Sequence, residues 1–593
     1  MPELSESITA IREGAKEDQL TYLTILQYHV TTPEVLPALN EVLQDARLTQ
    51  DIGWDLVQML VDIPGSDTCL ETVARLGNPR EVIIKVMEAL ERLAVAWHDQ
   101  VNIDDRDQPA VPATSDIPAK FITLLGMLAI LHRRIKTKYP SRFLGPSLVK
   151  VFEAYQPTPE MTAAVINLVR SLSGRKRPPL PMRTSSISVA NPDQDGDASK
   201  NAPDPEAEQE DPAEATLQNK LLQSFSSCIL QNYVNAHDMQ WSARLLELYQ
   251  PKRIIPGKKT LTQAFGEDEE LQKRDAVVGN LVALLRDLGL SDYSAFLVRN
   301  ITEQPAGSDP LLAFEDFSSP DDISLSPGGS VCLIAYWLFS ADVFGADNPQ
   351  PEISIFPEHC SILERFLGSD PQSEISSSPG IADALLAIGI GLEHRNFVAA
   401  GEGASFMVYH HHLTLVSVFH PDIQVRNAAT TFAGSILHSD PDDQNRLEIL
   451  EDLLENCMFA SLKACALKWL QEELIKAKQE GLSNVFSKQD VVERLQHAAF
   501  PDEMSALSMD SDALVEFWGE NHSFLLQAAN FAYFLFMGLK ELVPGGMESA
   551  VENRFSEPLI LAADKLRQVE GLDDGSKMHL EILVDRLRSI STS

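Results

Sequence analysis

Cysteines come first among the residues that could do chemistry, because a thiolate is a nucleophile and reacts with peroxide. The chain has six cysteines in 593 residues, and none lies in a CxxC pair. Cys69 and Cys360 have polar neighbours in the sequence, so we expect them to be exposed. Cys228, Cys332 and Cys465 lie among apolar residues, which is typical of a core. One hypothesis is therefore a redox-active thiol protein, which predicts a lowered thiol pKa at Cys69 or Cys360.

Patterns that could bind a metal or cofactor are incomplete. The adjacent histidines 410–412 would point about 100° apart on a helix, so at most two could share one ion. Asp193, Asp195 and Asp197 resemble the first ligands of a calcium loop, but Ala198 stands where the loop needs glycine. The chain lacks Walker A, GxSxG, HExxH and kinase motifs. We therefore expect no cofactor, no metal and no enzymatic activity.

The clearest charge anomaly is a basic stretch in a strongly acidic chain. The formal net charge is −38, yet residues 133–183 contain eleven lysines and arginines and two glutamates. The stretch ends in a proline-rich run, and an acidic segment follows, with nine acidic residues and one lysine in 191–214. The candidate docking residues within it are Arg133, Arg134, Lys136, Lys138, Arg142, Arg175, Lys176, Arg177 and Arg183.

Three interpretations of the basic stretch stay open. It could be a solvated face that pairs with the acidic segment of the same chain. It could be a docking surface for an acidic partner segment, or a compact basic signal for nuclear import. Phosphorylation at 184–186 would add negative charge beside the basic run and weaken the docking of an acidic partner.

The elements that must position these residues are predicted to be helices. Apolar residues recur at spacings of three and four, Pro and Gly mark short turns, and no alternating strand pattern occurs. We predict an all-α protein, an α-solenoid of HEAT/armadillo-like hairpins in two arms, residues 1–173 and 217–593. Residues 174–216 cannot fill a core, which predicts a disordered linker, and we expect loops near 302–328 and 368–380.

One segment carries the repeat pattern most clearly. His420 to Leu437 is similar to the second half of a HEAT unit. We expect Asp422 to cap a helix there, and Val425, Ala428 and Ala429 to pack against the preceding helix.

Overall charge and hydropathy restrict the possible partners. A pI near 4.7 argues against direct nucleic-acid binding, because phosphate would be repelled by most of the surface. The start of the chain is acidic and lacks the apolar core of a secretory signal. The apolar run at 524–539 is shorter than a bilayer span and contains two amides, which favours a buried helix. We expect a cytoplasmic protein without membrane contact, with nuclear entry as an open alternative.

Four short motifs resemble one protein family. They are Tyr139-Pro-Ser-Arg-Phe-Leu-Gly, Leu172-Ser-Gly-Arg-Lys-Arg-Pro-Pro-Leu-Pro, Tyr336-Trp-Leu-Phe and Ile381-Ala-Asp-Ala-Leu-Leu-Ala. They are similar to the fungal YAP-binding protein family, which is grouped with glomulin and the plant aberrant-root-formation protein.

The resemblance implies a non-enzymatic α-solenoid. Fungal relatives are associated with the oxidative-stress response and bind a bZIP stress transcription factor, whose activation by peroxide they assist. The alternatives it implies are a glomulin-like inhibitor that binds the RING subunit of cullin ubiquitin ligases, and a kinetochore-associated adaptor. It supplies no catalytic residues.

Overall fold

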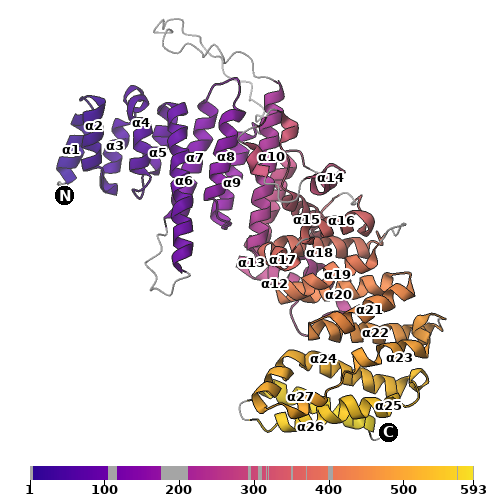
Figure 1. The fold of residues 1–593 in the computed structure, drawn as a ribbon. Coiled ribbons are helices and arrows are strands. Elements are labelled where there is room, and N and C mark those ends of the chain that lie inside the picture. The colour runs from indigo at the N-terminus through magenta and orange to yellow at the C-terminus, as the bar shows by residue number, and fades with distance from the viewer. Residues whose placement is uncertain are drawn as a thin grey trace. The chain divides into compact units, whose positions relative to one another are not determined.

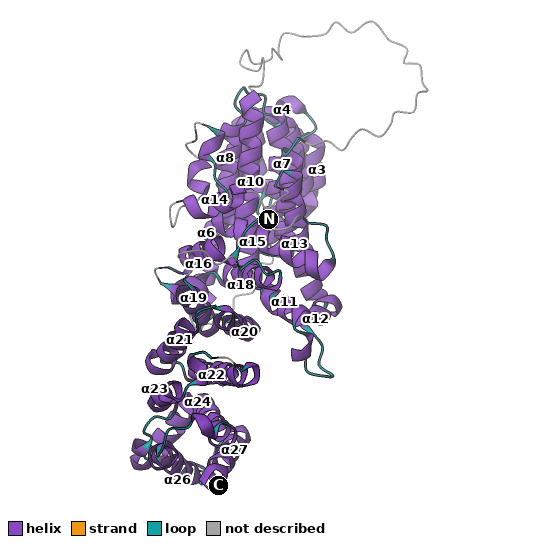
Figure 2. Ribbon diagram, turned by 90° about the vertical axis from the view of Figure 1, so that its right-hand side faces the viewer, coloured by secondary structure: helices purple, strands orange, loops and turns teal. Residues whose placement is uncertain are grey.

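The computed structural model describes residues 4–104, 116–174, 212–290, 295–304, 310–314, 317, 319–348, 352–368, 370–398, 405–481, 483–569 and 572–591. Within these ranges all regular structure is helical, and Figure 2 shows helices and loops without a strand. The prediction of an all-α protein is confirmed. The chain forms two compact units: unit 1 is Met1–Glu352 with Asp383–Ile388, and unit 2 is Ile353–Ala382 with Gly389–Ser593.

Unit 1 contains α1 (Leu4–Gly14), α2 (Gln19–His29), α3 (Leu36–Val42), α4 (Ala46–Leu60), α5 (Asp67–Leu76), α6 (Pro79–Asp104), α7 (Ile117–Arg134), α8 (Ser141–Ala154), α9 (Pro159–Leu172), α10 (Pro212–Ala236), α11 (Trp241–Tyr249), α12 (Leu261–Glu267), α13 (Glu269–Asp287), α14 (Ala295–Glu303) and α15 (Pro327–Phe344). Helices α2, α4, α6, α8 and α10 pack in sequence order in one layer, and α1, α3, α5, α7, α9 and α13 pack in the other. Figure 1 shows this succession and shows that α6 extends past its neighbours.

The helix at the centre of the later part of unit 1 is α15. It packs against α10, α11 and α14, and most of its side chains are buried. By length and composition it is the one described helix that could cross a membrane unaided, with a mean hydropathy of 1.2, but 67% of it is buried inside the structure. An all-round apolar helix of this kind is the expected core helix of a large helical protein.

Buried charges in unit 1 are paired or bonded to backbone. The guanidinium of Arg244 is 1% exposed and donates to both carboxylate oxygens of Asp275, at 3.0 and 2.8 Å. The side chain of Asp383, which is also buried, accepts from the backbone N–H groups of Trp241 and Ser242 at 2.8 and 3.1 Å. These contacts satisfy the first turn of α11, whose amides have no partner within the helix. They also explain why Asp383–Ile388 belongs to unit 1.

The boundary between the compact units differs from the predicted boundary between two arms. Helix α10 packs on α8, and α13 packs on α9, so helices from both sides of 174–216 belong to unit 1. Helix α10 begins at Pro212, within the range predicted as linker, and residues 175–211 lie outside the described residues.

Unit 2 contains α16 (Cys360–Leu367), α17 (Pro371–Ser377), α19 (Phe406–Phe419), α20 (Ile423–Ser439), α21 (Asp443–Asn456), α22 (Ala460–Glu480), α23 (Gln489–Ala499), α24 (Ser511–Gly538), α25 (Met547–Val551), α26 (Glu557–Leu566) and α27 (Asp574–Ser591), and α18 (Pro379–His394) supplies residues to both units. Helices α19 and α20 pack against each other, as do α22 and α24. The details predicted for α20 are confirmed. Asp422 accepts from the backbone of Gln424 at 2.6 Å, and Val425, Ala428 and Ala429 are buried.

The loop predicted at 368–380 is wrong for 371–377, which form α17, and for 379–380, which begin α18. Serine and proline favour loops, but here the side chain of Asp370 accepts from Ser373 N, and Pro371 occupies the first turn. A capping carboxylate and an N-terminal proline both stabilise a helix start. The loop predicted at 302–328 contains two short 3₁₀ turns, Pro310–Phe314 and Pro320–Asp322, in its described part.

Candidate partner-docking surface

The five candidate docking residues that the structure describes lie where α7 ends and α8 begins in unit 1. We call Arg133, Arg134, Lys136, Lys138 and Arg142 the cationic edge. Helix α7 ends at Arg134, and Pro140 directly precedes α8. The remaining predicted docking residues, Arg175, Lys176, Arg177 and Arg183, lie outside the described residues.

Two members of the cationic edge bind the ends of neighbouring helices. Nη1 of Arg134 donates to the carbonyl oxygens of Ala74 and Gly77 at 2.7 and 2.8 Å, and burial lowers the pKa of its guanidinium. Arg133 donates to the carbonyl oxygen of Ser171 at 3.2 Å. These carbonyls lie at or just beyond the C-terminal ends of α5 and α9, where helix carbonyls lack partners and a cation is favourable. Arg133 and Arg134 therefore have a structural role, so part of the local positive charge stabilises helix ends.

The other three cations are exposed, and two of them lie over one aromatic ring. Lys136, Lys138 and Arg142 are exposed, and no carboxylate of the described residues lies within ion-pair distance of them. Nζ of Lys138 lies 5.4 Å from the ring centre of Tyr139, and the guanidinium carbon of Arg142 lies 4.7 Å from it. This arrangement presents cations and an exposed tyrosine together, which suits an acidic peptide with an apolar or aromatic side chain.

The described end of the acidic segment, at Glu214, contacts the first turn of α8. Glu214, on α10, is 5% exposed, and its carboxylate accepts from the backbone N–H of Ser141 at 2.6 Å. A carboxylate at a helix N-terminus is favourable because it satisfies an amide and complements the helix dipole. The bond is made one residue before Arg142, so a carboxylate of the chain itself already occupies the start of α8.

The expected exposure of two cysteines is wrong. Cys69 is completely buried, with its thiol 3.4 Å from the carbonyl oxygen of Leu36, and Cys360 is 7% exposed. Burial raises the pKa of the Cys69 thiol to about 11 and, together with Glu364, that of Cys360 to about 12. A redox-reactive cysteine needs a lowered pKa and access, and these two have neither. Cys228 and Cys332 are buried as predicted, and Cys465 is half-buried.

Among the histidines at 410–412 and 420, His410, His412 and His420 make contacts within the fold. His410 is buried against Trp469, and burial lowers its pKa to about 3. His412 bonds to the carbonyl oxygen of Val408 at 2.8 Å, and His420 to that of Pro379 at 3.0 Å. The described residues contain no group of three or more His, Cys, Asp or Glu that could hold a metal ion. The aspartates at 193–197 lie outside them.

Unit 2 contains a network of charged side chains that was not predicted from the sequence. Glu473 is 1% exposed and accepts from Nε of Arg446 at 3.1 Å, and its other oxygen lies 2.6 Å from Nδ1 of His438. Nε2 of His438 lies 2.9 Å from Glu472. Burial acts to lower the pKa of His438, but the two carboxylates outweigh it and raise the pKa to about 9. His438 is therefore a cation at neutral pH.

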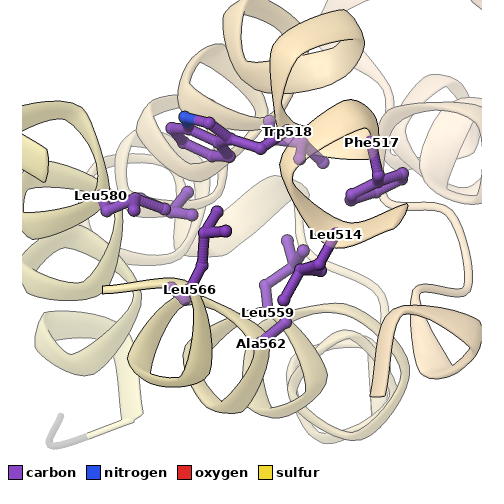
Figure 3. Close-up of a pocket in the computed structure, with 10 residues that line it drawn as sticks. Leu514, Phe517, Trp518, Leu559, Ala562, Leu566 and Leu580 are labelled. Carbon is purple, nitrogen blue, oxygen red and sulfur yellow. The ribbon is translucent and has the colours of Figure 1, made fainter. Parts of the chain in front are cut away.

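An apolar crevice lies among α24, α26 and α27. Figure 3 shows Leu514, Trp518, Leu566 and Leu580 pointing toward one another across it. Its accessible volume is about 10 Å³, room for about one water molecule, and its lining carries almost no polar surface. It supplies no chemistry and is too small for a ligand.

Comparisons with known proteins give two matches. The model of a family described as "Uncharacterised protein family, YAP/Alf4/glomulin" matches residues 1–577. "UPF0649 protein C1442.02" from Schizosaccharomyces pombe is 27% identical over 154 residues, which cover 23% of this chain. The match spans about a quarter of that relative, 24% of its length.

Proposed function

Because the chain belongs to the YAP/Alf4/glomulin family, we propose that it is a non-enzymatic helical-repeat scaffold that binds a bZIP stress transcription factor and supports its activation in the oxidative-stress response. The scaffold would be an α-solenoid of HEAT/armadillo-like hairpins. The layered packing of α1 to α10 and the α19–α20 hairpin support this description. We propose that it works in the cytoplasm and also enters the nucleus.

One observation assigns the proposed contact to a surface. Lys138 and Arg142 lie over the exposed ring of Tyr139, Lys136 is exposed close by in the sequence, and none of the three has a described carboxylate partner. In a chain of net charge −38, these three exposed cations form a local positive patch that attracts anionic groups. We propose that an acidic segment of the partner docks there, its carboxylates on the cations and an apolar side chain on Tyr139.

The expected strength of this contact is modest. Exposed ion pairs contribute roughly 0.2–1 kcal/mol each, so three of them supply about 0.6–3 kcal/mol before the tyrosine contact is added. Such a contact weakens with salt, because the Debye length falls from about 10 Å at 0.1 M to about 3 Å at 1 M. Tight binding therefore requires a second surface on the same protein.

The alternative function is a glomulin-like inhibitor of cullin–RING ubiquitin ligases. The family description names glomulin, which supports this alternative. A kinetochore-associated adaptor is the remaining possibility from the resemblance. Both would also be non-enzymatic scaffolds, so the fold does not separate them from the stress-factor proposal.

Affinity capture tests the proposal. The full chain, tagged and expressed at its natural level, is recovered from cells before and after brief peroxide treatment, and the partners are identified by mass spectrometry. We expect a bZIP factor to dominate after peroxide. Recovery of cullin–RING subunits or of kinetochore components in its place would overturn the stress-factor proposal and support the corresponding alternative.

A further inference from the structure

A hollow of about 640 Å³ lies on unit 1 where α2 and α6 begin and α4 passes between them. It is lined mainly by Gln19, Gln50, Asp51, Trp54, Asn78 and Glu81. All its charged lining is acidic, and its one aromatic side chain is a tryptophan. This combination is typical of sites that take a cationic side chain.

Trp54 is one of two exposed tryptophans in this chain. Trp54 and Trp97 are each 38% exposed, whereas Trp241, Trp337, Trp469 and Trp518 are at most 5% exposed. Nζ of Lys85 lies 5.2 Å from its ring centre, so the indole already meets one cation within the chain. Exposing a large indole to water is unfavourable. Tryptophan is also enriched among the residues that contribute most to binding at protein interfaces.

The carboxylates of the hollow lack cationic partners. Asp51 and Glu81 are exposed, and neither lies within ion-pair distance of a described lysine, arginine or histidine. The next acidic residue along α6, Glu88, is different. It pairs with Lys85 at 2.7 Å and accepts from Gln58 at 2.7 Å. Two unpaired carboxylates therefore flank the exposed Trp54.

Helix α6 also lines a hollow beyond its first turns. A second hollow of about 510 Å³ is lined by Gln58, Glu88, Glu91, Arg92 and Val95. Between Glu81 and Val95 the helix rises about 21 Å at 1.5 Å per residue, the length of a partner helix of about 14 residues. Val95 is 56% exposed and offers an apolar contact at the far end. We call the two hollows together the α4–α6 groove.

We propose that the α4–α6 groove binds a Lys/Arg-rich, helix-forming segment of a protein partner. A guanidinium of that segment stacks on Trp54 beside Asp51 and Glu81, and an apolar side chain about four turns away contacts Val95. Arginine suits the first position because its planar group stacks on aromatic rings and binds carboxylates in pairs. The inference rests on the proposed function only for the premise that the partner is a protein.

The groove and the cationic edge meet at the first turn of α6. Arg80 lies between the two lining residues Asn78 and Glu81, and its Nη2 donates to the carbonyl oxygen of Lys136 at 3.3 Å. Surfaces of opposite charge therefore adjoin on unit 1. A partner with an acidic stretch next to a basic stretch could occupy both, which supplies the second contact that the edge alone lacks.

A peptide titration tests the groove apart from any capture experiment. The probe is a synthetic 16-residue amidated amphipathic helix of arginine, leucine and alanine, labelled with a dye and followed by anisotropy against the full chain. The variants are Trp54→Ala and the double change Asp51→Lys with Glu81→Lys, all at exposed positions. The matched control, Glu13→Lys with Glu160→Lys, changes the net charge equally on α1 and α9.

We expect the double variant to weaken peptide binding about tenfold or more, because it replaces attraction at two contacts by repulsion. Trp54→Ala should weaken binding about fivefold through the lost cation–π contact. The control should change binding less than about twofold. Equal losses in control and double variant would mean non-specific attraction to an acidic protein and would overturn the inference. So would full binding by the double variant, whichever partner affinity capture recovers.

Discussion

Raising the pH should weaken unit 2 locally, because the network around Glu473 depends on a charged histidine. Glu473 is almost fully buried and is held by Arg446 on one oxygen and His438 on the other. Loss of the His438 proton removes one of two cations from a buried carboxylate. An uncompensated buried charge is strongly destabilising.

The magnitude follows from the pKa of His438, which rises from 6.5 to about 9 in the folded chain. This rise corresponds to about 3 kcal/mol of stability. Because the folded pKa is raised, the contribution is fully present below pH 6.5 and is lost as the pH rises through 9. It should amount to roughly 2–3 kcal/mol at pH 7 and to only a few tenths at pH 9.5.

Hydrogen exchange of α20 and α22 is the suitable assay, since a chain of two compact units need not unfold in one step. The free energy of local opening is compared between the natural chain and His438→Gln at pH 7 and pH 9.5. We expect the variant to be less stable by roughly 2–3 kcal/mol at pH 7 and nearly equal at pH 9.5. A difference that is the same at both pH values would refute the reasoning, because it would show a packing effect rather than a protonation effect.

Two pairs of substitutions and one labelling experiment should separate structural from exposed positions. Arg134→Ala should destabilise the α5–α7 region by about 1–3 kcal/mol in hydrogen exchange, because two carbonyls lose their donor, whereas Lys136→Ala should change stability by less than about 0.5 kcal/mol. Gly329→Ala should lower the melting temperature or prevent folding, because its Cβ would lie 2.2 Å from a backbone oxygen of Ser227. Gly126→Ala meets no atom within 4 Å in a helix interior and should stabilise by about 0.5–1 kcal/mol. Cys360 should resist iodoacetamide and mild peroxide at pH 7.5 until urea unfolds unit 2; rapid labelling of the native chain would contradict its burial.

Local patterns predicted the structure well where the cause was local. Asp422 caps α20, and the residues at 425, 428 and 429 are buried, because a cap and a 3–4 spacing depend only on neighbouring residues. Cys69 could have been placed correctly by the same spacing. It shares the buried face of α5 with Leu70 and Val73, and its polar sequence neighbours point elsewhere.

Contacts between distant segments could not be predicted. Arg134 reaches carbonyls 57 and 60 residues away, and Arg446 meets Glu473 from another helix. One sequence contains no signal for such pairs, since each of these residues is typical of an exposed helix surface. The basic stretch was found from its charge, but only the structure separates its capping arginines from the three exposed cations.

The measurement that tests the central claim most directly is the affinity between the chain and the bZIP factor recovered after peroxide, with the cationic edge intact and reversed. The reversed chain carries Lys136→Glu, Lys138→Glu and Arg142→Glu. A chain with three exposed lysines of unit 2 reversed (Lys476, Lys488 and Lys540) serves as the charge-matched control. We predict that edge reversal weakens binding about tenfold or more at 0.1 M salt, that the loss shrinks at 1 M salt, and that the control binds normally. Unchanged affinity of the edge-reversed chain would contradict the account and leave the edge as a solvated boundary of unit 1.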